Sequence, residues 1–62
     1  IGLWAGAVWN ALNDANGSLT VKGLKKTTKL KEKEVFAAIG WLAREGKVNV
    51  TEIEKDVEVN LI

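Results

Sequence analysis

One stretch of the chain, residues 30–46, carries the clearest helical pattern of apolar positions. At about 100° per residue its apolar side chains fall on one stripe, made of Val35, Ala38, Ile39 and Leu42. Glu32 and Glu34 lie in the expected first turn and Arg44 in the last, which suits the helix dipole. We expect Gly46 to end this helix in the left-handed conformation.

Two further helices are predicted before it. Residues 1–15 repeat apolar positions at helical spacing, with Trp4 and Trp9 at the edges of an inward stripe formed by Ile1, Ala5, Val8 and Leu12. Asn16-Gly17 is expected to end this helix. Thr20 is a suitable N-cap for a short helix over residues 21–27, with Lys22 and Lys26 facing outward and Val21, Leu24 and Thr28 facing inward.

After Gly46 the apolar period changes from about 3.6 to 2. Residues 47–51 and 57–61 each alternate polar and apolar side chains, as half-buried strands do, with Glu54-Lys55-Asp56 as the turn of a hairpin. Ile53 fits either the first strand or the turn. Ser18-Leu19-Thr20 is short but can add one edge strand. The order of elements predicts an α+β fold of three helices and a C-terminal β-hairpin.

The composition of the chain limits the classes of function that it can have. The 62 residues predict a single domain, residues 1–62, and contain neither cysteine nor histidine. With no glycine-rich phosphate loop either, no catalytic set, metal site, cofactor site or small-molecule substrate site is evident, and we do not expect an enzyme. Without a signal peptide or a long apolar run, we expect a cytoplasmic protein that does not enter a membrane. The chain starts at Ile1 rather than Met, so we expect it to be part of a longer one.

The segment from Leu30 through the stripe to Glu45-Gly46-Lys47-Val48 resembles the recognition helix and first wing strand of winged helix-turn-helix domains. The run AIGWLAREGKV, with SLTVKGL before it, is similar to a small bacterial family of winged-helix domains of unknown function. The resemblance covers nearly the whole chain. It implies a three-helix domain with a two-stranded wing, in a fold that mostly binds DNA but also serves as a protein-interaction or dimerisation module.

A cluster of six lysines lies within residues 22–33. One interpretation is a patch that contacts the phosphates of double-stranded DNA, and the other is a solvated surface that keeps a small protein soluble. The candidate nucleic-acid-binding residues are Lys22, Lys26, Lys29, Lys31, Lys33 and Arg44. The third helix offers few side chains that could read bases, and the hairpin is acidic, so we expect mainly backbone contacts.

The outward sides of the first and third helices combine small and aromatic residues, which is typical of protein interfaces. The candidate interface residues are Leu3, Gly6, Ala7, Phe36, Ala37, Gly40 and Trp41. Alternatively, Phe36 and Trp41 fold over the core or the wing, as we expect of Trp4 and Trp9. The sequence thus predicts a winged-helix protein associated with DNA, as transcription regulators are, and homodimeric. The alternative is a protein-interaction or homodimerisation module without sequence-specific DNA binding.

Overall fold

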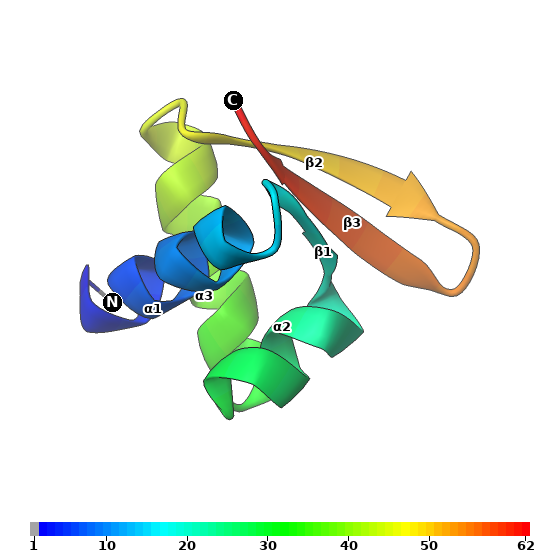
Figure 1. Ribbon diagram of the computed structural model, residues 1–62, viewed down its shortest axis with the longest axis horizontal. Helices are drawn as coiled ribbons and strands as arrows, with labels where there is room; N and C mark the ends of the chain where they lie inside the picture. Colours follow the sequence, from blue (N-terminus) through cyan, green and yellow to red (C-terminus); the bar gives the residue numbers. More distant parts are fainter. Residues whose placement is uncertain (1) are drawn as a thin grey trace.

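The computed structural model describes residues 2–62, and their backbone forms three helices and a three-stranded antiparallel sheet (Figure 1). Helix α1 crosses α3, α2 connects to α3 through a tight turn, and the β2–β3 hairpin extends beyond the helices (Figure 1). In chain order the elements are α1 (Gly2–Asp14), β1 (Ser18–Thr20), α2 (Val21–Thr28), α3 (Glu32–Arg44), β2 (Val48–Ile53) and β3 (Asp56–Leu61). The predicted α+β class, with its three helices and hairpin, is confirmed.

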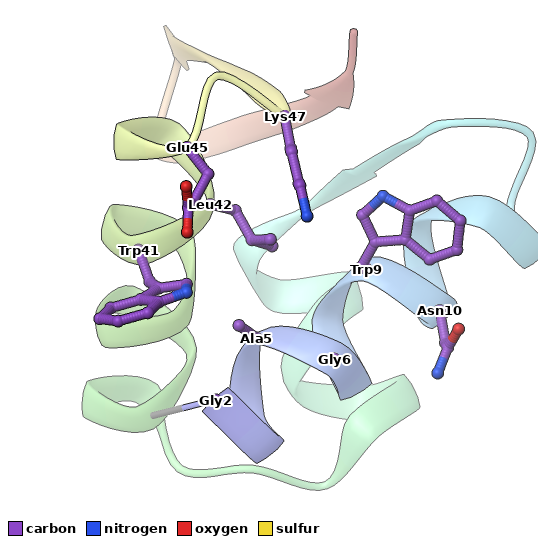
Figure 2. A pocket seen from close by; sticks show the side chains of 9 residues that line it. All are labelled: Gly2, Ala5, Gly6, Trp9, Asn10, Trp41, Leu42, Glu45 and Lys47. Carbon is purple, nitrogen blue, oxygen red and sulfur yellow. The ribbon is translucent and has the colours of Figure 1, made fainter.

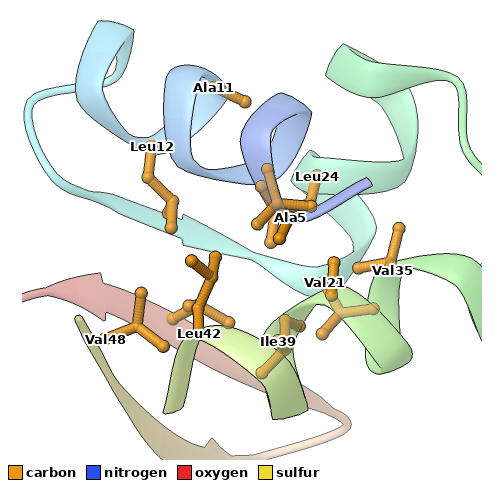
Figure 3. Close-up of a cluster of buried hydrophobic side chains, with 12 residues drawn as sticks. Ala5, Ala11, Leu12, Val21, Leu24, Val35, Ile39, Leu42 and Val48 are labelled. Carbon is orange, nitrogen blue, oxygen red and sulfur yellow. The ribbon is translucent and has the colours of Figure 1, made fainter. Parts of the chain in front are cut away.

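The core is made only of apolar side chains, which come from all three helices and from the sheet (Figure 3). Its buried members are Ala5, Val8, Ala11, Leu12, Val21, Leu24, Val35, Ala38, Ile39, Leu42, Val48 and Val59. Within residues 2–62 no polar or charged side chain is buried. The entire predicted stripe of α3 is therefore inside, and so are Ala5, Val8 and Leu12 of α1, whereas Ile1 lies outside the described residues.

The expected burial of Trp9 is wrong, because its side chain is 37% exposed. Ala11 is buried and Trp4 packs against the core, which places the buried stripe of α1 farther round the helix than the sequence pattern suggested. Helical geometry puts Trp9 about 140° from Trp4 around the axis, so the two indoles cannot both face the core. Trp4 is partly buried as expected, and Trp9 belongs to the surface.

The helix boundaries follow from local capping. Thr20 has an extended backbone, and its hydroxyl accepts a hydrogen bond from the Gly23 N–H at 3.1 Å, as predicted for the N-cap of α2. Helix α2 ends at Thr28, one residue later than predicted, and Lys29 follows in the left-handed conformation with φ 62°. Because Lys31 is still extended, α3 begins at Glu32 and not directly after Leu30.

Both long helices end in left-handed residues. After α1, Asn16 has φ 63° and the Gly17 N–H donates to the Leu12 carbonyl at 2.7 Å. After α3, Gly46 has φ 72° and the Lys47 N–H donates to the Leu42 carbonyl at 3.0 Å. These are the six-to-one hydrogen bonds of Schellman caps. The predicted stop signals are confirmed at the C-terminal ends of α1 and α3. After the cap of α3 the chain continues directly into β2.

Strand β3 is the centre of the sheet, which has the order β1-β3-β2. Ser18–Thr20 pairs with residues 58–60 of β3, so the third strand that the sequence allowed is present. On its other side β3 pairs with β2 from Val48↔Leu61 to Ile53↔Asp56. Ile53 therefore belongs to the strand, and the hairpin turn consists of Glu54 and Lys55, the latter with φ 64°.

The two predicted strands differ in how far they are covered. Val57, Val59 and Leu61 share one face of β3, with Val59 fully buried and the other two partly buried, as the alternation predicted. In β2 the expected half-burial holds at Val48 but not at Val50, which is 48% exposed. The helices cover only the base of the hairpin, and its outer part projects past them (Figure 1).

Alanine substitutions at two glycines test the cap of α3. Gly46→Ala is expected to lower the free energy of unfolding by about 1–2 kcal/mol, because a Cβ disfavours the left-handed conformation. Gly40→Ala, the control in the interior of α3, is expected to raise it by about 0.5–1 kcal/mol, since a Cβ there meets nothing within 4 Å. Urea unfolding with an unchanged m-value measures both, and equal effects would contradict the assigned cap.

Candidate nucleic-acid interface and inter-helix groove

The helix-turn-helix brings the predicted phosphate-contacting residues onto one continuous basic segment. Lys22 and Lys26 lie one turn apart on α2, Lys29 forms the turn, Lys31 is the N-cap of α3, and Lys33 lies in its first turn. All five side chains are exposed. Residues 22–33 hold six lysines and one glutamate, Glu32, a net charge of +5. We call residues 22–33 the basic segment.

Two carboxylates lie near the turn: Glu32 belongs to the basic segment, and Glu34, directly after the segment, is held by a backbone hydrogen bond. The Lys31 N–H donates to Glu34 Oε1 at 2.8 Å, so Glu34 caps the start of α3. This is half of a capping box, because a lysine ammonium has no acceptor with which to complete the reciprocal bond. Glu34 is therefore drawn toward the backbone, and Glu32 is the exposed acid of the segment. Glu32 is therefore the main side chain that would repel an approaching phosphate.

The outward stripe of α3 runs from the basic segment to the end of the helix. Helical spacing places Lys33, Ala37, Gly40 and Arg44 opposite the buried stripe. Gly40 is open, since a Cβ built there meets nothing within 4 Å. Small residues at the centre of the stripe let a partner approach the backbone closely, but only Lys33 and Arg44 offer hydrogen-bond donors. The distant Arg44 thus extends the basic segment by one cation at the far end of α3.

A groove of about 300 Å³ separates the exposed sides of α1 and α3 (Figure 2). Its lining residues are Gly2, Ala5, Gly6, Trp9, Asn10, Trp41, Leu42, Glu45 and Lys47. Figure 2 shows the indoles of Trp9 and Trp41 on opposite sides of the groove, one from each helix, with Glu45 and Lys47 together at one end. We call this feature the α1–α3 groove.

A second hollow adjoins the α1–α3 groove. It has a volume of about 320 Å³ and is lined by Trp41, Arg44 and Glu45. Trp41 borders both hollows and is 45% exposed, so its indole forms a ridge between them. At this exposure Trp41 is less covered than Trp4, which is one of the partly buried side chains that pack against the core.

The structure divides the predicted protein-interface residues among several surfaces. Gly6 and Trp41 line the same α1–α3 groove. Leu3, which is 91% exposed, and the partly buried Ala7 lie one turn apart on α1 but do not line the groove. Five residues separate Phe36 from Trp41, which puts their side chains about 140° apart around α3. Phe36 is exposed on the flank away from the groove, while Ala37 and Gly40 belong to the outward stripe.

Sequence reasoning missed four polar or aromatic members of the α1–α3 groove: Trp9, Asn10, Glu45 and Lys47. The sequence pattern places Trp9 with the core, Glu45 just before the helix-ending glycine, and Lys47 at the start of the first hairpin strand. A signal was present, because residues 2–13 contain no charged side chain. A wholly solvated side of a helix ordinarily carries charge, so its absence pointed to a partly covered surface there.

The hairpin is electrostatically opposite to the basic segment. Residues 48–61 carry Glu52, Glu54, Asp56 and Glu58 against Lys55 alone, a net charge of −3. Asp56 Oδ1 accepts a hydrogen bond from the Val57 N–H at 2.6 Å, whereas Glu52 and Glu54 are exposed. Carboxylates at this position repel phosphates, so the wing provides no basic contact surface beyond Lys55.

No group of three or more potential metal-binding side chains occurs in residues 2–62. In the same part of the chain, the helices are all too short or too polar to cross a membrane.

The fold and the helix-turn-helix define the class of protein. The chain belongs to a family described as winged helix-turn-helix domain (DUF2582), whose model matches residues 1–61. It is similar to protein BT2368 from Bacteroides thetaiotaomicron, whose solution NMR structure matches with a TM-score of 0.83 and 35% sequence identity. That match covers 97% of this chain and 72% of the other. No curated protein matches the chain. The winged-helix resemblance is confirmed.

The surface position of Trp41 is tested by comparing it with a fully buried residue. Trp41→Gln is expected to lower the free energy of unfolding by about 1 kcal/mol or less, because the indole is nearly half exposed. Leu24→Ala, which empties a fully buried site, is expected to cost about 2–5 kcal/mol. Thermal or urea unfolding gives both values. If Trp41→Gln lowers the free energy of unfolding as much as Leu24→Ala does, the indole is part of the core and the assigned surface position is wrong.

Proposed function

We propose that this domain associates with double-stranded DNA through the phosphate backbone, using the basic segment of α2, the turn and the start of α3. The observation that carries the proposal is the placement of five exposed lysines around the turn of a helix-turn-helix. In such folds the recognition helix enters the major groove while neighbouring residues meet the sugar-phosphate backbone. Lysines at this turn suit phosphates as flexible point charges.

Affinity on this proposal comes mostly from electrostatics and only weakly from base sequence. Base reading relies on arginine, asparagine, glutamine or lysine side chains that reach base edges. The outward stripe of α3 supplies only Lys33 and Arg44, with Ala37 and Gly40 between them. A helix of this kind fits closely into a groove but distinguishes few bases. We therefore expect dissociation constants in the range of non-specific complexes, with strong dependence on salt.

The acidic wing constrains the orientation of the proposed complex. Winged helices that use the hairpin lay it against the backbone or the minor groove. Here Glu52 and Glu54 are exposed on the hairpin, and DNA phosphates would repel them. The complex is therefore expected to use the helices, with the hairpin turned away from the duplex. The opposite charges of the two regions would help to orient the domain as it approaches DNA.

Removal of two lysines from the basic segment tests the proposal. The double variant Lys26→Gln/Lys29→Asn is expected to bind a mixed-sequence duplex more weakly and to reduce the slope of log affinity against log salt by about 1.8, since each lost phosphate contact removes about 0.9. Asparagine is chosen because it tolerates the left-handed backbone at position 29. Fluorescence anisotropy over a range of salt concentrations measures the slope.

Lys55 provides a matched control for Lys29. Both are lysines with positive φ, 64° and 62°, but Lys55 lies in the acidic hairpin. Lys55→Asn makes the same chemical change in the same backbone conformation and is expected to leave both affinity and salt slope unchanged. The proposal fails if the unmodified domain shows no binding to duplex DNA at low salt. It also fails if Lys55→Asn weakens binding as much as the single variant Lys29→Asn, measured alongside the double variant.

A further inference from the structure

We propose that the free edge of strand β2 binds an extended basic peptide of another protein, which joins the sheet as an added strand. The binding edge is formed by residues 49–53, and we call it the β2 edge. It lies on the hairpin, apart from the basic segment and from the lining of the α1–α3 groove. The inference does not depend on DNA binding, and the proposed complex with DNA leaves the hairpin turned away from the duplex.

Strand β2 lies at the border of the sheet and is open over most of its length. The sheet has the order β1-β3-β2, so within residues 2–62 strand β2 pairs on one side only. After Val48, whose side chain is buried, all five remaining residues of β2 are exposed. The outer part of the hairpin extends beyond the helices (Figure 1). A partner can therefore reach the edge of β2 and both faces beside it.

Two hydrogen bonds at the base of the hairpin fix the alternation of the ladder. The Ile62 N–H donates to the Lys47 carbonyl at 3.0 Å, on the side of β2, and the Leu61 N–H turns the other way and donates to the Gly17 carbonyl at 2.7 Å. Bonded and non-bonded pairs alternate along an antiparallel ladder. The register between β2 and β3 has no interruption. Every second residue of β2, counted from residue 48, therefore directs its backbone groups away from β3.

Val50 and Glu52 are the exposed residues in that alternating set. Their N–H and C=O groups, two donors and two acceptors, point to the free edge. The N–H of Thr51, by contrast, belongs to the ladder with β3. Free backbone groups of this kind are a template for an added strand, and the main-chain hydrogen bonds that form supply the affinity.

Strand β2 lacks most of the features that protect sheet edges in proteins. Edge strands are commonly very short, covered by another element, or interrupted by proline, lysine or a bulge. Strand β2 has six residues, contains neither proline nor lysine, and pairs with β3 in a continuous register without a bulge. The opposite border of the sheet is different, because β1 has three residues and continues directly into α2. The β2 edge is thus the border suited to receive a strand.

The acidic charge of the hairpin selects the occupant. Glu52 on the β2 edge and Glu54 in the turn are both exposed, and residues 48–61 carry a net charge of −3. Val50 and Glu52 are two residues apart and therefore share one face of the strand. An added strand with an apolar side chain beside Val50 and a lysine beside Glu52 complements both.

Two other occupants fit the β2 edge less well. A second copy of the chain would bring a hairpin of the same negative charge to the edge. The basic segment of that copy is helical on both sides of its turn, so it cannot supply an extended strand. Nucleic acid is repelled by the carboxylates. An extended basic segment of another protein suits both the free backbone groups and the charge.

The probe for the first measurement is the peptide acetyl-Thr-Lys-Thr-Val-Thr-Lys-Thr-amide, titrated into the isotope-labelled domain without nucleic acid. Its lysines and valine share one face, and the order of its side chains is the same in both directions, so it can pair parallel or antiparallel. Amide signals of residues 49–53 are expected to shift, and the amides of Val50 and Glu52 are expected to exchange with solvent more slowly in the complex.

The matched control peptide has glutamate in place of both lysines. It is expected to cause no shifts at the same concentration, because its charge has the same sign as that of the hairpin. The proposal is overturned if the lysine peptide leaves residues 49–53 unchanged. Equal shifts with the two peptides would also overturn it.

A proline substitution tests the backbone pairing. Val50→Pro removes the outward N–H of residue 50 but none of the hydrogen bonds between β2 and β3, and proline is tolerated at such positions of edge strands. It is expected to weaken binding of the lysine peptide at least about tenfold. Val50→Thr keeps the N–H and a β-branched side chain, and its effect is expected to be less than about threefold. Equal effects would exclude the pairing, and a changed mass of peptide-free Val50→Pro would assign the edge to a second copy instead.

A charge reversal tests the choice of occupant without altering the backbone. Glu52→Lys is expected to weaken binding of the lysine peptide about three- to tenfold and to reverse the preference between the two peptides. Asp14→Lys changes the net charge by the same amount at the exposed end of α1, outside the sheet, and is expected to have less than about a twofold effect. If Asp14→Lys weakens binding as much as Glu52→Lys, general attraction to the charge of the domain explains the binding and the assigned edge is wrong.

Discussion

The packing of one stripe of α3 against α1 and α2 is the interaction on which the rest of this domain depends. Val35, Ala38, Ile39 and Leu42 are all buried, and together they provide a third of the twelve buried side chains. In a chain of this size the core is thin, so each such contact is a large fraction of the stability. Because the stripe fixes the rotation of α3 about its axis, it also determines which side chains the helix presents outward, namely the stripe from Lys33 to Arg44 and the Trp41 ridge.

The surface built on that core is divided into three regions with different physical character. The basic segment around the helix-turn-helix carries a net charge of +5, and the hairpin carries −3. Between α1 and α3 lies a groove whose α1 side has no charged residue before Asp14. The basic segment lies outside the lining of the groove and of the hollow beside it, whereas Arg44 at the far end of α3 lines that hollow.

The sequence was sufficient to predict most of the architecture, because the helix periods, the caps at Thr20 and Gly46, and the strand alternation all agree with the fold. It was insufficient where burial depends on how elements meet. Trp9 and Val50 have apolar character but are exposed, since α1 is rotated toward Ala11 and the hairpin projects beyond the helices. The basic segment could be predicted because it is contiguous in sequence. The α1–α3 groove is lined by residues about forty positions apart in the sequence, and no local sequence pattern predicts that they lie side by side.

The central claim is that the basic segment, and not the wing, meets nucleic acid. A titration of the isotope-labelled domain with mixed-sequence duplex DNA at low salt, followed in two-dimensional amide spectra, tests it most directly because every element reports separately. The account predicts progressive shifts in residues 22–33 and along the outward stripe of α3, with residues 52–58 of the acidic hairpin unchanged. Shifts confined to the hairpin, or spectra that do not change at all, would contradict it.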